Sequence, residues 1–182
     1  RYFSPAINLR SQEVVLFGQT IPIGTDLLFQ AVDLPELILG VEICEDLWVN
    51  HAPSATLVDM GALVVVNPSA SPELVAKASY RRQLVGMQSA TLLCGYVYAG
   101  CDWSESTMDV VMSGHQLIAS NGRIVAERVP FAVDTRLRPR GNDGALVQTE
   151  SAFRDYFATT AEAWEGITYM KSRPVAGDTA AA

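Results

Sequence analysis

A cysteine followed directly by two acids, Cys44-Glu45-Asp46, stands at the end of an apolar run from Leu37 to Ile43. A buried strand that ends in this way can present a nucleophile at the edge of a sheet. The thiolate is the reactive form of cysteine, and it forms next to a base or in a positively charged environment. Because the neighbours of Cys44 are acids, a group from another part of the fold must activate it.

Lysine is the second informative residue type, because only two occur. They are Lys77 and Lys171, and both follow Cys44 in the sequence. Chemistry that needs a lysine from a segment before the nucleophile strand therefore has no donor within these 182 residues. His51 and His115 stand in turn-like contexts without a partner in register, so neither is predicted to be a catalyst.

Composition bounds the class of protein. With 182 residues and 49% hydrophobic content, the chain is one domain or a large piece of one. The net charge of -7 argues against nucleic acid or an anionic membrane as partner, and the apolar runs are too short to span a bilayer. Three cysteines without metal-ligand spacing indicate a reducing, cytoplasmic location. The opening at Arg1 predicts a piece of a longer protein without a signal peptide.

Strand and helix patterns alternate along the first two thirds of the chain. The helix over 55–61 takes Ser54 as its N-cap, and the long helix over 71–93 takes Ser71 as N-cap with Pro72 at its first position. Alternation followed by a meander predicts an α/β fold with a parallel centre and an antiparallel flank. Strands are expected over 13–17, 27–33, 37–44, 62–67, 95–100, 108–112, 116–119 and 124–127, with a turn at Pro22/Gly24 and a hairpin at Asn121-Gly122.

Several motifs in series carry a family resemblance. The segment Gly40-Val41-Glu42-Ile43-Cys44-Glu45-Asp46-Leu47-Trp48 resembles the nucleophile segment of nitrilase-type carbon–nitrogen hydrolases. From residue 20 to 131, the order and spacing of the motifs resemble the glutaminase domain of glutamine-dependent NAD synthetases. The later motifs are Asn67-Pro68-Ser69-Ala70-Ser71-Pro72, Lys77, Tyr80-Arg81, Tyr96-Val97-Tyr98-Ala99-Gly100, Ser104-Glu105-Ser106-Thr107-Met108-Asp109, Ser113-Gly114 and Asn121-Gly122.

The resemblance implies a fold and a reaction. The fold is an α-β-β-α sandwich of two mixed sheets, of which residues 1–135 would form the C-terminal portion; residues 136–182 are predicted to be loop, a short helix over 152–164 and a mobile tail. The reaction is hydrolysis of glutamine by a Glu-Lys-Cys triad. The ammonia passes to a synthetase domain of the same polypeptide, which amidates nicotinic acid adenine dinucleotide and uses ATP and magnesium. No cofactor is expected in the present domain, and the parent is expected to be a homo-oligomer.

The resemblance also assigns site residues. Cys44 occupies the position of the nucleophile, and a backbone amide near it, with the triad lysine, would stabilise the oxyanion. Glu45 would bind the α-ammonium of glutamine, Ser71 and Lys77 its α-carboxylate, and Trp48 would form an aromatic wall.

The chain departs from the family pattern before the nucleophile. No lysine precedes Cys44, and the earlier glutamates Glu13, Glu36 and Glu42 fall outside the family's motif. We therefore expect this chain alone to hydrolyse glutamine negligibly. The open alternatives are an amidase acting on another small amide and an inactive fragment or binding module.

Each site residue also has a structural interpretation. Cys44 could be a buried thiol, Glu45 and Asp46 a solvated pair, Lys77 solvent-facing and Trp48 part of the core. Cys94 and Cys101 are expected to be inert, and Arg81 and Arg82 to pair with Glu73, Glu105 or Asp109.

Overall fold

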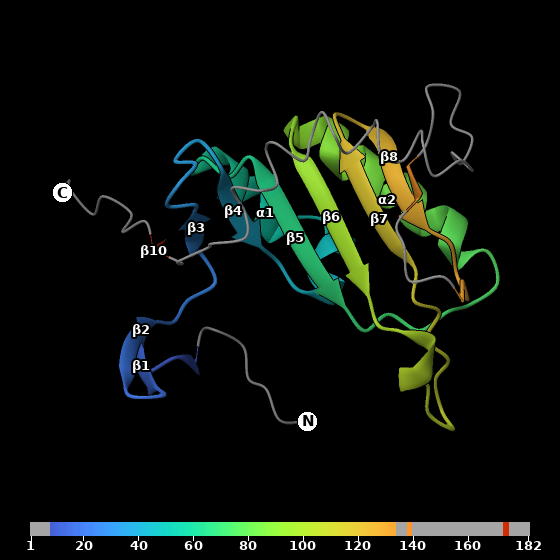
Figure 1. The fold of residues 1–182 in the computed structure, drawn as a ribbon, viewed down its shortest axis with the longest axis horizontal. Coiled ribbons are helices and arrows are strands. Elements are labelled where there is room, and N and C mark those ends of the chain that lie inside the picture. The colour runs from blue at the N-terminus through green and yellow to red at the C-terminus, as the bar shows by residue number, and fades with distance from the viewer. Residues whose placement is uncertain (1–7, 134–137, 140–172, 175–182) are drawn as a thin grey trace.

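A computed structural model describes residues 8–133 and two further two-residue strands, Arg138–Pro139 and Arg173–Pro174. Its main body is one mixed eight-stranded sheet with helices packed against it (Figure 1). The strand order is β10-β3-β4-β5-β6-β7-β8-β9. The strands are β3 (Leu28–Gln30), β4 (Ile38–Val41), β5 (Val64–Ser69), β6 (Gly95–Gly100), β7 (Gln116–Ser120), β8 (Arg123–Arg128), β9 (Arg138–Pro139) and β10 (Arg173–Pro174).

The centre of this sheet is parallel and its flanks are antiparallel. β4 pairs with β5 and β5 with β6 in parallel, while every other pair in the sheet is antiparallel. Parallel neighbours need a crossover connection, and the two helices supply these crossovers. This arrangement confirms the predicted parallel centre with an antiparallel flank.

Helices α1 (Pro53–Asp59) and α2 (Lys77–Leu92) cover the same face of the sheet. On that face, alternate residues of β5, β6 and β7 point inward and are almost fully buried, as the period of two along a strand requires. Val85 of α2 packs among them and is itself fully buried. The main core cluster comprises Leu47, Val65, Val85, Cys94, Tyr96, Tyr98, Leu117 and Ala119.

The opposite face of the sheet is also apolar but only half-buried. Val66, Val97 and Ile118 lie in register across three strands and all keep partial exposure. A sheet that is apolar on both faces is typical of a layer covered on each side. The described residues thus supply one sheet and one helix layer of the expected α-β-β-α sandwich, which agrees with a partial domain.

A separate two-stranded hairpin precedes the main sheet. Strands β1 (Glu13–Leu16) and β2 (Gln19–Pro22) pair around Phe17 and Gly18, whose φ angles are 51° and 76°. Two positive φ values in a two-residue loop define the turn that matches strand twist. The strand over 13–17 was predicted, but the turn was misplaced at Pro22/Gly24, because Phe17 is not a residue type that signals a left-handed turn.

Tertiary contacts overturn three local predictions. Helix α2 begins at Lys77, not at Ser71, because the Glu73 amide donates to the Val111 carbonyl at 2.7 Å and holds this segment extended. Residues 108–112 lack the predicted strand, because the chain turns there and the Thr107 amide donates to the Val110 carbonyl at 2.9 Å. Ser54 lies inside α1, whose N-cap is Ala52, so Ser54 is not the cap.

Some predictions lie outside the described residues, including the helix over 152–164 and nearly all of 136–182. Among the described helices, none is both long and apolar enough to cross a membrane. No group of three or more His, Cys, Asp or Glu in the described part is arranged to hold a metal ion.

Gly40 sets how closely the nucleophile strand approaches α1. A Cβ at this position would lie 3.0 Å from Leu57 Cβ and 3.3 Å from Ala62 Cβ. We expect Gly40→Ala to lower the free energy of unfolding by about 1–3 kcal/mol, as overpacking does, measured by urea denaturation. In a Leu57→Ala background the added cost should shrink in part, since Leu57 Cδ1, which would lie 3.1 Å from the new Cβ, is gone while Leu57 Cβ remains. If Gly40→Ala lowered the free energy of unfolding equally in both backgrounds, contact with the Leu57 side chain would not be the cause.

Candidate functional site

The candidate site lies where the three parallel strands end. Cys44 follows β4, Ser69 is the last residue of β5, and Cys101 follows β6. The Cys101 amide donates to the Ser69 carbonyl at 2.9 Å, which ties two of these ends together. In sheets of this kind, ligands bind at the carboxyl ends of the strands. The predicted nucleophile therefore stands at the edge where the fold can form a site.

Cys44 begins a short 3-10 helix, η2 (Cys44–Trp48), in a left-handed conformation with φ 51°. The Asp46 carboxylate accepts the Ile43 amide at 2.8 Å and closes the turn around the cysteine. The Cys44 side chain is half-buried, whereas Cys94 in the core is only 4% exposed. Cys44 is thus not the fully buried thiol of the structural alternative, and Asp46 serves the turn.

Asn67 holds the backbone of Cys44 on both sides. Its Oδ1 accepts the Cys44 amide at 3.1 Å, and its Nδ2 faces the Cys44 carbonyl at 3.4 Å. The same Nδ2 donates to the Tyr96 hydroxyl at 3.2 Å. Asn67 and Tyr96 are fully buried, so these hydrogen bonds are protected from water.

Glu42 anchors this chain of hydrogen bonds in the core. Its carboxylate accepts from the Tyr96 hydroxyl through one oxygen and from the Ser54 amide at 2.8 Å through the other. The Ser54 hydroxyl in turn accepts from Gln88 of α2 at 2.8 Å. Glu42 thus supplies the capping group for α1 that the sequence assigned to Ser54. Sequence reasoning missed Glu42 as part of the site, because burial of a carboxylate has no local signal.

The predicted substrate residues Trp48 and Lys77 come together. Lys77 Nζ lies 5.4 Å from the centre of the Trp48 ring, and the Tyr80 ring stacks on Trp48 at 5.3 Å between centroids. Burial and then the charge of Arg81 lower the pKa of Lys77, while the charge of Glu73 opposes the shift. Lys77 is half-buried beside Trp48, so it is not simply solvent-facing.

Glu45 and Ser71 lie close in sequence to Trp48 and Lys77, but neither side chain forms a hydrogen bond with them. Glu45 is exposed next to Cys44, and Ser71 is half-buried in the extended segment before α2. Within residues 8–133, no hydrogen bond connects either side chain to another predicted site residue.

A buried ionic network fixes the segment that carries Ser71. Arg81 Nη1 donates to Glu73 at 3.0 Å, and Ser113 Oγ donates to the same carboxylate oxygen at 2.6 Å. Burial raises the pKa of Glu73, but these hydrogen bonds outweigh it and lower the pKa overall. The predicted pairing of Arg81 with Glu73 is confirmed, whereas Arg82 pairs with Glu127 at 2.6 Å instead.

His115 completes the network, contrary to the prediction that it has no partner. Its Nδ1 lies 2.7 Å from Arg81 Nη1 and its Nε2 lies 2.9 Å from Glu127. An arginine can only donate, so Nδ1 must be the unprotonated nitrogen and Nε2 the donor. Burial lowers the pKa of His115, and the charge of Arg81 lowers it further. The imidazole is therefore held neutral in one tautomer.

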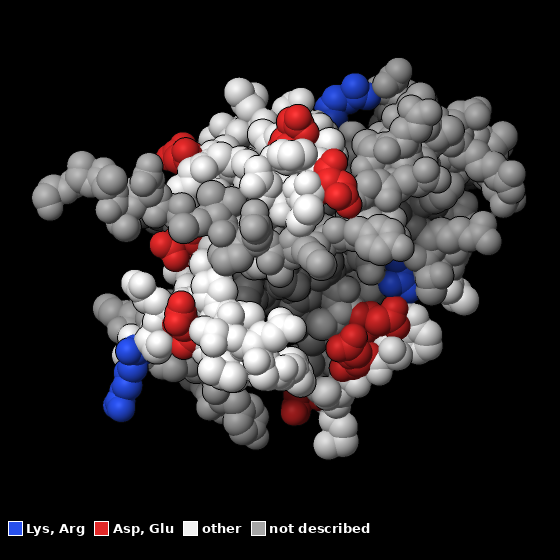
Figure 2. Space-filling view, turned by 60° about the vertical axis from the view of Figure 1, so that its left-hand side comes forward, with Lys and Arg blue, Asp and Glu red and all other residues white. Residues whose placement is uncertain are grey.

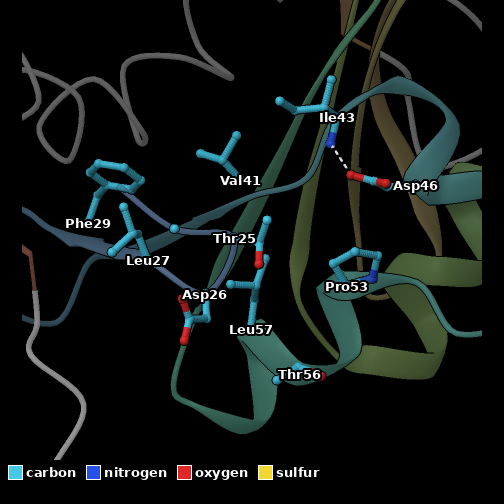
Figure 3. Close-up of a pocket in the computed structure, with 11 residues that line it drawn as sticks. Thr25, Asp26, Leu27, Phe29, Val41, Ile43, Asp46, Pro53, Thr56 and Leu57 are labelled. Atoms are coloured by element: carbon cyan, nitrogen blue, oxygen red, sulfur yellow. Dashed lines mark hydrogen bonds between the residues drawn. The ribbon is translucent and has the colours of Figure 1, made fainter. Parts of the chain in front are cut away.

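A cavity of about 500 Å³ adjoins the nucleophile segment without including Cys44. Ile43 and Asp46 lie together on one side of it, and Leu27 and Phe29 on another (Figure 3). None of the predicted substrate residues Glu45, Trp48, Ser71 and Lys77 lines this cavity, so it is not the predicted glutamine pocket. Its lining residues are Gly24, Thr25, Asp26, Leu27, Phe29, Val41, Ile43, Asp46, Pro53, Thr56 and Leu57.

Acidic side chains recur over the described surface shown in Figure 2, where Lys and Arg occupy isolated positions. This distribution agrees with the net charge of -7. The described residues on this face offer a nucleic-acid phosphate backbone no concentrated positive patch.

Most of the chain is similar to glutamine-dependent NAD(+) synthetases. It is 41% identical over 133 residues, 73% of its length, to the enzyme of Mycobacterium tuberculosis, and covers 20% of that protein. The chain thus spans about a fifth of the length of the curated relatives it matches. The crystal structure of the synthetase from Cytophaga hutchinsonii matches with a TM-score of 0.57 at 27% identity, over 75% of this chain and 21% of that one.

The chain is also similar to a nitrilase-superfamily structure and, in its C-terminal part, to an adenylyltransferase family. Nit3 of Saccharomyces cerevisiae, a member of the nitrilase superfamily, has the same fold, with a TM-score of 0.51 at 17% identity over 75% of this chain and 46% of that one. Residues 114–182 match the family described as glutamate-ammonia ligase adenylyltransferase. A 54-residue part, 30% of the chain, is 48% identical to a bifunctional glutamine synthetase adenylyltransferase/adenylyl-removing enzyme of Bifidobacterium longum, of which it covers 5%.

The neutral His115 predicts a loss of stability in mild acid. The unfolded chain takes up a proton at this residue below about pH 6.5, whereas the folded chain, with its lowered pKa, does not until the pH falls further. The free energy of unfolding should therefore fall between pH 7.5 and 5.5, and His115→Gln should flatten that decline. His51→Gln, at an exposed position, is the matched control and should keep it. An unchanged decline in His115→Gln would contradict the assignment.

The Tyr96 hydroxyl predicts a second stability effect. Tyr96→Phe leaves the buried Glu42 carboxylate short of one donor, which costs about 1–3 kcal/mol of unfolding free energy. Tyr80→Phe removes the same atom from a ring that is 53% exposed and should change stability by less than about 0.5 kcal/mol. Urea denaturation of both variants makes the comparison. Equal effects would show that the Glu42 hydrogen bond contributes little.

Proposed function

We propose that this chain, which shares the nitrilase-superfamily fold and sequence ancestry with a segment of glutamine-dependent NAD synthetases, carries the nucleophile and part of the substrate pocket of a glutamine-hydrolysing site. The observation that carries the proposal is the placement of Cys44. It is half-buried, sits in a strained turn at the carboxyl edge of the parallel strands, and begins the short helix whose Trp48 ring contacts Lys77.

The proposed reaction has two halves. The Cys44 thiolate attacks the side-chain amide carbon of glutamine and forms a tetrahedral intermediate with a negatively charged oxygen. The carbon–nitrogen bond then breaks, the nitrogen takes up a proton and leaves as ammonia, and a thioester remains on the sulfur. Water attacks the thioester, which releases glutamate and the free thiol.

The geometry narrows the choice of oxyanion donor. The Cys44 amide is already bound to Asn67, so it is not available to a substrate oxygen. The next amide along the chain, that of Glu45, opens the turn of η2 and is the backbone donor that we assign. The second donor of the proposal is a lysine, which this chain does not supply before Cys44.

Recognition of the amino-acid end is assigned to residues around Trp48. The exposed Glu45 carboxylate would pair with the α-ammonium, and Lys77 with Ser71 would bind the α-carboxylate. Trp48, fixed by its contacts with Lys77 and Tyr80, would form the wall of the pocket. A ligand with charges of both signs therefore fits this site better than a simple amide does.

The product side of the proposal lies beyond this chain. Ammonia would pass to a synthetase domain of the same polypeptide, where ATP and magnesium are used to amidate nicotinic acid adenine dinucleotide. Since the general base and the lysine are not supplied here, we propose that this chain binds glutamine and presents the nucleophile but turns over negligibly by itself.

Binding can be tested without turnover. Glutamine should slow the alkylation of Cys44 by iodoacetamide, a small uncharged reagent, whereas butyramide, an amide without the amino-acid end, should not. Glu45→Gln removes one charged hydrogen bond, so the protecting concentration of glutamine should rise roughly 10- to 150-fold. Alkylation without glutamine should persist in Glu45→Gln, because the reagent does not use the ammonium pocket.

Peptide mapping by mass spectrometry separates Cys44 from the other two cysteines. Equal protection by glutamine and butyramide would favour an amidase acting on a different small amide. Absence of protection by either ligand would favour a module without a substrate site.

A further inference from the structure

Two hydroxyl groups form a chain that ends on the sulfur of Cys44. The Tyr98 hydroxyl donates to Ser69 Oγ at 2.9 Å, and Ser69 Oγ donates to Cys44 Sγ at 3.4 Å. Ser69 closes β5 and Tyr98 lies on the neighbouring β6, on the helix-covered face of the sheet. This chain is separate from the Glu42–Tyr96–Asn67 chain, which reaches the backbone of the same cysteine.

Both hydroxyls are held in place by burial. Ser69 is 5% exposed and Tyr98 is 1% exposed. The guanidinium carbon of Arg81 lies 5.4 Å from the centre of the Tyr98 ring. This cation–π contact helps to hold the ring in place. A serine hydroxyl has one proton, and because its oxygen accepts from Tyr98, that proton is free to point at the sulfur.

The chemical consequence follows from the charge on sulfur. A thiolate is a much stronger hydrogen-bond acceptor than a thiol, so a fixed donor stabilises the charged form. It also limits the rotation of the side chain, so that the sulfur lone pair is held in a single direction. Ser69 cannot serve as the general base, because in this arrangement it donates a proton instead of accepting one.

We propose that Ser69 is a further catalytic residue, whose hydroxyl donates a hydrogen bond to the Cys44 thiolate, and that Tyr98 positions this hydroxyl. The inference rests on the proposed function, in that Cys44 is taken as the nucleophile. It assigns a role to the first serine of the Ser69-Ala70-Ser71 segment that is distinct from the substrate contact proposed for the second.

The test uses the whole chain and reads the thiol directly. The rate of Cys44 alkylation by iodoacetamide is measured against pH, with each cysteine followed by peptide mapping. Ser69→Ala should move the pH midpoint of Cys44 alkylation upward by about one unit, as expected for loss of one hydrogen bond to a charged group. Ser69→Thr keeps the hydroxyl and should restore the midpoint, and Tyr98→Phe should move it upward by less.

The titratable groups around the sulfur are the same in all these variants. They are Lys77 of α2, Glu45 of η2 and the thiol of Cys101 after β6. The buried Cys94 is an internal control for folding, because it is alkylated only when the core opens. A variant that leaves Cys94 protected has kept its fold.

An unchanged midpoint in Ser69→Ala, with Cys94 protected, would overturn the proposal. If Ser69→Ala exposes Cys94, the test passes to Tyr98→Phe. A raised pH midpoint of Cys44 alkylation in Tyr98→Phe supports the proposal, and an unchanged midpoint overturns it. A midpoint raised equally in Ser69→Thr would also overturn it, since a retained hydroxyl should suffice. Failure of the proposed function is read separately, as the absence of protection by glutamine.

Discussion

The buried carboxylate of Glu42 is the constraint on which the rest of this site depends. A charge removed from water must be matched by donors, because leaving it unpaired costs several kcal/mol, on the order of 3–5. Its donors come from β6 through Tyr96 and from the start of α1 through the Ser54 amide. Satisfying Glu42 therefore locks the nucleophile strand, its neighbouring strand and the first helix into one arrangement. Asn67 extends this arrangement to the backbone of Cys44, so the strained turn of the cysteine is supported from the core.

The parts of the fold that follow local patterns could be predicted from the sequence. The valine run that became β5, the Tyr96-Val97-Tyr98 run of β6 and the Asn121-Gly122 hairpin depend on near neighbours in the chain. Wrong or missed features depend on distant contacts. Ser71 satisfies every local rule for an N-cap, but the backbone pairing of Glu73 with Val111 delays α2 to Lys77. Glu42, His115 and Tyr98 gained their roles only because the fold buries them beside partners more than ten residues away. The motif located Cys44, but not the hydroxyl that faces its sulfur.

Two similarities of different kinds meet in this chain. A part of 133 residues resembles the NAD synthetases, whereas residues 114–182 match an adenylyltransferase family. The overlap falls on β7 and β8, which close the antiparallel flank of the sheet and supply His115 and Glu127 to the buried network. Residues within the second similarity thus help to position α2 and the segment before it. The half-buried apolar face of the sheet shows where the second sheet of a nitrilase-type sandwich would pack.

The most direct measurement is a replacement in a complete synthetase. The segment of the Mycobacterium tuberculosis enzyme that aligns with 133 residues of this chain is exchanged for those residues, and NAD formation is followed with glutamine or with ammonia as the nitrogen donor. The chimera should use both donors, and Cys44→Ala should abolish its use of glutamine while use of ammonia persists. A chimera that uses ammonia normally but never glutamine, or a Cys44→Ala chimera that still uses glutamine, would contradict the assignment of Cys44 as the nucleophile of a glutamine-hydrolysing site.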